Sequence, residues 1–158
     1  MAFTIRAATK GDEGLILTLL HELAVYEKLT DKFKITREVV ARDFLGEHAP
    51  LKVHLLHEGE KPAGIATWYF TYGSFAASRG VFLEDLFVRP EFRGRGYGKK
   101  LIAHLAQQVV KAGGNKLEWA VLDWNKPSID FYERLGAERM KGWHIYSLGG
   151  EALAELGA

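Results

Sequence analysis

Residues 82–99, FLEDLFVRPEFRGRGYGK, constrain the fold more than any other part of the chain. They open with an apolar run, interrupted only by Glu84 and Asp85, that stops at Pro90, where a central strand cannot continue because proline lacks the backbone donor. A basic, glycine-rich loop follows at residues 93–98, and apolar residues at helical spacing come next. We therefore predict an interior strand, a glycine loop and an amphipathic helix in that order.

This order of elements is typical of an anion site. The first turn of a helix has unpaired N–H groups with partial positive charge, and glycines let a phosphate approach the backbone closely. The spacing Arg93-x-x-Gly96-x-Gly98 is neither the Walker loop, which ends in Gly-Lys-Ser/Thr, nor the dinucleotide loop G-x-G-x-x-G. The loop by itself therefore predicts a phosphate-bearing ligand other than ATP or NAD, with a plain turn carrying two solvated arginines as the alternative.

Length and composition limit the kinds of protein that this chain can be. At 158 residues and 47% hydrophobic content we expect a single domain over residues 1–158. The chain has no apolar run of membrane-spanning length and no signal-like start, so we expect a soluble, cytoplasmic protein without membrane contact. The absence of cysteine excludes disulfides and thiolate metal sites, and the net charge of +1 argues against nucleic-acid binding by bulk electrostatics.

The remaining periodicities predict a mixed α/β sheet flanked by helices, in the order β-α-α-β-β-β-α-β-α-β. Parallel strands late in the chain would bring the glycine loop and Asn125 to the carboxyl edge of the sheet, where open α/β sheets bind ligands. The elements expected besides those above are strands at residues 3–7, 51–57, 63–72, 117–122 and 143–148, and helices beginning after Asp12, at Thr36 and at Pro127.

A second informative pattern, Asn-x-Pro-Ser-x-x-Phe-Tyr-x-x-x-Gly, begins at Asn125. Asn125 occupies the position of a helix N-cap, and Pro127 suits the first helical turn. Ile129 and Tyr132 are three residues apart and so share a helix face, which would turn the phenol toward the neighbouring strand. The alternative is an ordinary amphipathic helix, and for Phe131 we adopt it.

The two patterns together resemble the cofactor motifs of the GCN5-related N-acetyltransferases (GNAT). The loop is similar to their acetyl-CoA loop, Arg/Gln-x-x-Gly-x-Gly/Ala, and the pattern at Asn125 is similar to their second cofactor motif. Further segments resemble the spermidine/spermine N1-acetyltransferases and the related thialysine N-epsilon-acetyltransferases: Tyr26-Glu27, residues 44–48 and 69–72, Leu83-Glu84-Asp85, Trp124-Asn125 and Gly142-Trp143. The resemblance implies a GNAT-type fold and a homodimeric enzyme that moves acetyl from acetyl-CoA to a primary amine.

The chemistry of that reaction assigns roles to two residues. An alkylammonium ion, with a pKa near 10.4, has no lone pair until it loses a proton, so the site needs carboxylates and a base. Glu84 is the candidate base, because it alternates with apolar residues on one strand face, with Asp85 expected on the opposite face together with Leu83. Tyr132 can return a proton to the departing thiolate, and the amine attacks directly without an acyl-enzyme.

Other site residues are implied by the resemblance alone. Backbone N–H groups would hold pantetheine and the thioester oxygen at Leu86, Phe87 and Val88, and the pyrophosphate at Arg93, Gly94, Arg95, Gly96, Tyr97, Gly98 and Lys99. The second motif would add Asn125, Pro127, Ser128 and Tyr132 to the cofactor site. The amine would meet Tyr26, Glu27, Glu84, Asp85 and Trp143. No metal is expected, since the six histidines lack ligand-type spacing.

The acceptor is predicted from two departures from the polyamine enzymes. Gly73-Ser74-Phe75 stands where those enzymes tend to have Asp-Pro-Trp, and Lys141 replaces the acid before Gly142-Trp143. Because a long polyamine needs several carboxylates, we expect thialysine or a lysine-like amine to be preferred over a diamine or polyamine. Acetylation of protein N-termini or lysines is the alternative among enzymes. A non-catalytic acyl-CoA-binding module and a nucleic-acid-binding domain are the alternatives from other classes.

Overall fold

The structure is a computed structural model that describes residues 2–158. The chain forms two compact units, of which the first ends at Leu122 and the second spans Asp123–Ala158. Within the described residues, no helix has both the length and the apolar character that crossing a membrane requires.

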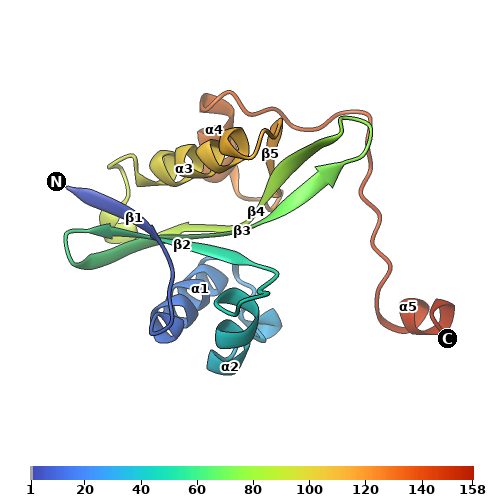
Figure 1. Ribbon diagram of the computed structural model, residues 1–158, viewed down its shortest axis with the longest axis horizontal. Helices are drawn as coiled ribbons and strands as arrows, with labels where there is room; N and C mark the ends of the chain where they lie inside the picture. Colours follow the sequence, from blue (N-terminus) through green and yellow to red (C-terminus); the bar gives the residue numbers. More distant parts are fainter. Residues whose placement is uncertain (1) are drawn as a thin grey trace. The chain divides into compact units, whose positions relative to one another are not determined.

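The first unit is built on a five-stranded sheet in the order β1-β2-β3-β4-β5 (Figure 1). The first three pairings are antiparallel and the last, between β4 and β5, is parallel. The predicted mixed sheet is therefore confirmed. Its strands are β1 (Phe3–Ala7), β2 (Lys52–Glu58), β3 (Lys61–Gly73), β4 (Ser78–Val88) and β5 (Lys116–Trp119).

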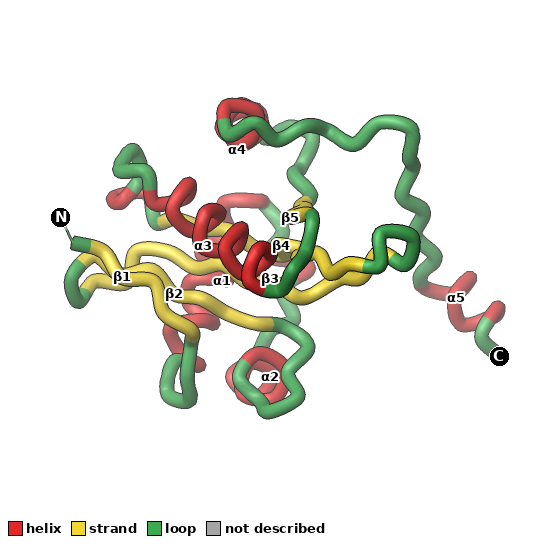
Figure 2. The backbone as a smooth tube through the Cα atoms, turned by 45° about the horizontal axis from the view of Figure 1, so that its top comes forward, coloured by secondary structure: helices red, strands yellow, loops and turns green. Residues whose placement is uncertain are grey.

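Helices cover both faces of this sheet (Figures 1 and 2). On one face lie α1 (Glu13–Glu27) and α2 (Arg37–Val39), which continues directly as the π-helical turn η2 (Val40–Phe44). On the other face lies α3 (Tyr97–Lys111). Two short 3-10 turns, η1 (Thr30–Lys32) and η3 (Pro90–Phe92), follow α1 and β4.

The core under α1 is made from the apolar stripe that the sequence predicts. Ile16, Leu19, Leu20 and Leu23 are all buried, and they pack with Val40 of η2 against the inward residues of the sheet, namely Val53, Leu55, Ile65 and Phe87. Burial of such side chains contributes about 1.5–3 kcal/mol each. This packing fixes the end of α1 relative to β4, which matters below because both carry acidic residues.

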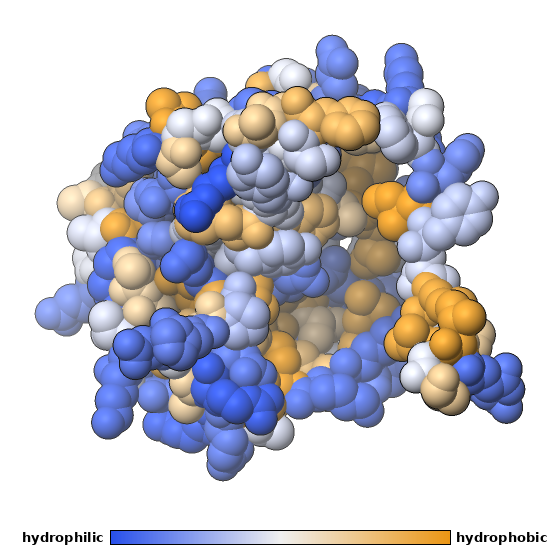
Figure 3. All heavy atoms as spheres, turned by 45° about the vertical axis from the view of Figure 1, so that its right-hand side comes forward, coloured by the Kyte–Doolittle hydropathy of each residue, from blue (hydrophilic) through white to orange (hydrophobic). Residues whose placement is uncertain are grey.

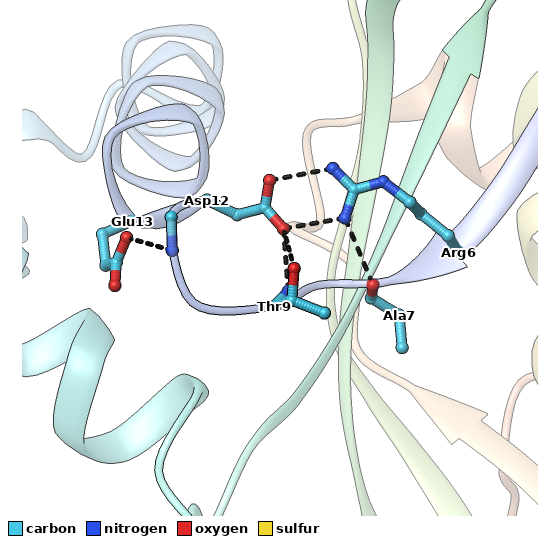
Figure 4. A network of polar contacts seen from close by, with 6 residues as sticks. Arg6, Ala7, Thr9, Asp12 and Glu13 are labelled. Carbon is cyan, nitrogen blue, oxygen red and sulfur yellow. Dashed lines mark hydrogen bonds and ion pairs between the residues drawn. The ribbon is translucent and has the colours of Figure 1, made fainter.

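A polar network fixes the start of α1 to β1 (Figure 4). The Asp12 carboxylate accepts two hydrogen bonds of 2.8 Å from the Arg6 guanidinium and one of 2.7 Å from the Thr9 N–H. These contacts lower the pKa of Asp12 to about 2, and the hydrogen bonds from Arg6 make the largest contribution. Asp12 is the N-cap residue of α1, as predicted, but its side chain is used by β1 and the preceding turn rather than by the helix.

The second unit contains α4 (Lys126–Arg134) and α5 (Gly150–Leu156). The strand predicted at residues 143–148 is not formed in the described chain, where these residues have no regular secondary structure. Alternation alone cannot make a strand, because the backbone hydrogen bonds of a strand come from a paired neighbour.

The surface agrees with the balanced composition. On the face drawn in Figure 3, hydrophilic residues cover much of the outside and apolar residues appear in smaller groups between them. The near-equal numbers of basic and acidic residues, 21 and 20, mean that any strongly charged site has to be local.

Candidate active site

The glycine loop between β4 and α3 has the backbone expected of an anion site. Gly94 and Gly96 have φ values of +76° and +78°, and Gly96 is the N-cap residue of α3. The first helical hydrogen bond runs from the Lys100 N–H to the Gly96 carbonyl at 3.0 Å, so the N–H groups of Tyr97, Gly98 and Lys99 precede the regular helical pattern. A Cβ added at Gly94 or Gly96 would meet no described atom within 4 Å, so this side of the loop is open.

The two arginine side chains of the loop brace the loop itself. Arg93 donates from Nε to the Val88 carbonyl at 2.8 Å, and its guanidinium carbon lies 5.1 Å from the centre of the Tyr26 ring and 5.7 Å from that of Phe87. Arg95 donates to both carboxylate oxygens of Glu58 at 2.7 Å. The alternative of two merely solvated arginines does not fit these contacts. The backbone N–H groups of the loop are therefore the candidate binding groups for an anion.

The edge of β4 is open next to this loop. β5 pairs with Gly80–Leu83 of β4 and ends at Trp119, whereas β4 continues to Val88. Among residues 2–158, no strand pairs with residues 84–88 on the side where β5 lies. The backbone of Leu86, Phe87 and Val88 therefore borders an unpaired edge, the kind of edge to which an extended ligand can add.

A β-bulge interrupts β4 at Glu84. Thr67 of β3 pairs with Asp85 and the next residue, Trp68, pairs with Leu83, which leaves Glu84 as the extra residue in the described register. Consecutive residues of β3 point to opposite faces, so their partners Asp85 and Leu83 do too. The prediction that these two residues share a face is wrong, because a bulge inverts the alternation beyond it.

Beside the bulge, Asp85 interacts electrostatically with two other acidic side chains, Glu27 and Glu84. Asp85 is part-buried and accepts a hydrogen bond of 2.5 Å from the Thr67 hydroxyl, while Glu84 is exposed and Glu27 is the last residue of α1. Burial, which is only partial at Glu84, raises the pKa of each of the three carboxyls, and the nearby charge of Asp85 raises the pKa of both Glu27 and Glu84 further. We call Glu27, Glu84 and Asp85 the acidic cluster. A cation placed there would relieve the repulsion among its members.

The second motif forms the predicted capped helix in the second unit. The Asn125 side chain accepts a hydrogen bond of 3.4 Å from the Ser128 N–H, and Pro127 lies in the first turn of α4. Tyr132 follows on the same helix, with its ring centre 5.4 Å from that of Phe131. Trp143 lies beyond α4, outside regular secondary structure.

Two further residues were not predicted for the site. The Thr67 hydroxyl donates a hydrogen bond to Asp85, and the Glu58 carboxylate accepts hydrogen bonds from Arg95. Each is far from its partner in the sequence, so only strand pairing and loop packing reveal it. No group of three or more histidine or acidic side chains within residues 2–158 has an arrangement that could hold a metal ion.

Comparison with known proteins identifies the family. Residues 18–137 match the model of the Acetyltransferase (GNAT) family, a span that contains the glycine loop, the bulge of β4 and the motif at Asn125. The chain belongs to the GNAT family of acetyltransferases. The family implies the use of acetyl-CoA. The resemblance deduced from the two motifs is thereby confirmed.

Two curated relatives of the acetyltransferase are similar over nearly the full length. The thialysine N-epsilon-acetyltransferase of Bos taurus is 42% identical over 168 residues, covering 99% of this chain and 98% of the relative. The L-ornithine N5-acetyltransferase of Arabidopsis thaliana is 31% identical over 197 residues, covering 96% of this chain and 86% of the relative. An integron cassette protein from the mobile metagenome of V. cholerae has a similar structure, with a TM-score of 0.84 at 26% identity over 99% of this chain and 98% of that one.

Proposed function

We propose that this acetyltransferase moves acetyl from acetyl-CoA to the terminal primary amine of a small amino acid such as thialysine or a lysine-like compound. The observation that carries the proposal is the acidic cluster next to the open edge of β4. A cofactor lying along that edge would bring its thioester close to carboxylates that attract an ammonium group and can accept its proton.

The cofactor is held mostly by backbone. The N–H groups of residues 94–99 bind the pyrophosphate at the start of α3, where the helix dipole adds to the attraction. Pantetheine extends along Leu86, Phe87 and Val88 as an added strand would. The second cofactor motif, on α4, adds Asn125, Pro127, Ser128 and Tyr132 to the residues that bind the cofactor.

The reaction is a direct transfer within a ternary complex. Glu84 removes a proton from the ammonium group, directly or through one water. Its pKa is raised, which makes the carboxylate a stronger base. The amine nitrogen then forms a bond to the carbonyl carbon, and the developing oxyanion takes hydrogen bonds from the backbone of β4. The C–S bond breaks as the amide forms, Tyr132 gives a proton to the CoA thiolate, and the nitrogen loses its second proton to water, from which Tyr132 is reprotonated while Glu84 releases its proton to solvent.

Asp85 and Glu27 position the amine rather than accept its proton. The Thr67 hydroxyl holds the Asp85 carboxylate in one orientation, which makes it a fixed counter-ion. Glu27 follows Tyr26 in the chain, and the Arg93 guanidinium lies over the Tyr26 ring. The end of α1, which would contact the amine, is thus connected to the cofactor loop through the Arg93 side chain.

The choice of a short acceptor rests on sequence and on the relatives. Both curated relatives described above are named for amino acids with a terminal amine, and the chain has Lys141 and Gly73-Ser74-Phe75 where polyamine enzymes tend to carry acids. A cationic Lys141 would repel a distant ammonium and can pair with a substrate carboxylate. Diamines and polyamines are the second candidate, because a further relative is spermidine/spermine N(1)-acetyltransferase-like protein 1 of Homo sapiens, 32% identical over 98% of this chain but only 24% of that protein.

We also infer that the enzyme is a cytoplasmic homodimer that works as a single domain over residues 1–158. Size-exclusion chromatography with light scattering tests the dimer directly. A monomer at every concentration up to that of the assays would contradict it.

A panel of acceptors tests the proposed reaction. Release of free thiol from acetyl-CoA is followed with thialysine, lysine, ornithine, putrescine, spermidine and a peptide with a free N-terminus, and kcat/KM is compared. We expect thialysine to lead. A clear lead for spermidine or the peptide would refute the acceptor, and binding of acetyl-CoA without turnover of any amine would favour a non-catalytic acyl-CoA-binding module.

A further inference from the structure

Glu58 is a buried carboxylate that the proposed chemistry does not use. It is the last residue of β2, and its side chain is only 3% exposed. An ionised group in such a position is costly unless it is fully hydrogen-bonded, so the groups that bond to it indicate its role. All three of the hydrogen bonds that the structure gives this carboxylate come from the acetyl-CoA loop.

The three hydrogen bonds join Glu58 to both sides of Gly96. Arg95 donates from Nη1 to the two carboxylate oxygens at 2.7 Å each, and the Tyr97 hydroxyl donates to Oε2. Arg95 also donates from Nη2 to the Glu91 carbonyl at 3.1 Å. The residues before and after the N-cap glycine of α3 are thus fixed to the sheet through one side chain.

We propose that Glu58 is a positioning residue that holds the acetyl-CoA loop in its binding conformation through Arg95 and Tyr97. Gly94 and Gly96 are conformationally free residues, and ordering them on binding would cost affinity. If the loop is already fixed to the sheet, this loss of conformational entropy does not weaken binding of the pyrophosphate. The inference rests on the proposed cofactor site and adds a residue that never touches the cofactor.

The sign of the effect separates positioning from electrostatics. Removing a negative charge close to the proposed anion site, and freeing the Arg95 guanidinium, would strengthen CoA binding if charge alone mattered. Removing the anchor of the loop would weaken it. Glu58→Gln therefore gives opposite results under the two accounts.

Isothermal titration with CoA provides the first measurement. We expect Glu58→Gln to raise the Kd about ten- to hundred-fold, which corresponds to about 1.4–2.8 kcal/mol. The matched control is Glu60→Gln, which removes the same charge from an exposed position in the turn after β2 and should change the Kd by less than about threefold. An unchanged or lower Kd in folded Glu58→Gln would overturn the proposal.

A truncated acetyl donor provides the second measurement. S-acetylpantetheine lacks the pyrophosphate, so kcat/KM with this donor should be nearly equal in wild type and Glu58→Gln, whereas KM for acetyl-CoA rises at unchanged kcat. Equal losses with both donors would mean general damage to the fold and would overturn the positioning role.

A milder variant decides the question if Glu58→Gln does not fold. Tyr97→Phe keeps the ring and the hydrogen bonds from Arg95 to Glu58 but removes the hydrogen bond from the Tyr97 hydroxyl, and we expect a two- to tenfold rise in the Kd for CoA. An unchanged Kd for CoA would refute the inference. Wild-type protein that fails to bind CoA would instead refute the proposed function itself.

Discussion

Replacing Gly96 with alanine tests the proposed cofactor site at the point where backbone conformation and ligand approach meet. Gly96 has a φ of +78°, and a Cβ added there would meet no described atom within 4 Å. The substitution therefore has two separable effects: a conformational cost in the free protein, and a methyl group in the space through which the pyrophosphate would approach.

The structure offers a matched control at the other end of the same helix. Gly113 follows α3 with a φ of +67°, and a Cβ there would likewise meet none of the described atoms within 4 Å. An L-residue in the left-handed region costs about 1–2 kcal/mol. At about 2–4 °C per kcal/mol for a chain of this size, both variants should lose about 2–8 °C in Tm.

Only the Gly96 variant should lose cofactor affinity. A hydrogen bond to a charged group contributes about 1.5–3 kcal/mol, so losing one from the backbone to the pyrophosphate should raise the Kd for CoA roughly 10- to 150-fold. Titration calorimetry with CoA measures the Kd, and differential scanning calorimetry measures the Tm. If Gly96→Ala binds CoA as tightly as Gly113→Ala, the backbone of this loop does not hold the pyrophosphate.

Three further predictions concern the chemistry and the acid stability. Tyr132→Phe should lower kcat by roughly ten- to ten-thousand-fold with a nearly unchanged Kd for CoA, and near-normal turnover would return Tyr132 to a packing role. Glu84→Gln should remove the acidic limb of the kcat/KM profile, since burial and Asp85 raise the pKa of that carboxyl, and a wild-type profile would argue against Glu84 as base. Burial and the neighbouring His104 lower the pKa of His54 to about 4, so its contribution to stability is complete above about pH 6.5 and is lost as the pH falls toward 4. In urea unfolding, His54→Gln should remove about 1–2 kcal/mol of the change in the free energy of unfolding over this pH range, a value discounted for the partial exposure of the ring. His48→Gln, at an exposed position, should leave that change intact.

The sequence predicts the elements that local patterns encode. The end of β4 before Pro90, the loop with two glycines at positive φ, the start of α3 and the cap at Asn125 all follow from the preferences of single residues or short spacings. The family resemblance rests on the same short motifs, which is why the order of the residues is enough to indicate it.

The bulge at Glu84 could not be predicted in this way. Period-2 alternation places Glu84 and Asp85 on opposite faces and carries on through the strand, and nothing in the residues themselves marks an extra one. The bulge depends on the register between β3 and β4, in which Thr67 meets Asp85 and Trp68 meets Leu83.

The family, the strand–loop–helix unit and the residue types available for acetyl transfer can therefore be inferred from the order of the residues. Tertiary structure decides which carboxylates interact, that β4 extends beyond the end of β5, and that the arginines of the loop form hydrogen bonds to Val88 and Glu58. The physical reason is the sequence separation of the interacting residues. Caps, turns and glycine conformations depend on neighbours in the chain. Partners such as Glu58 and Arg95, 37 residues apart, meet only when the sheet has formed.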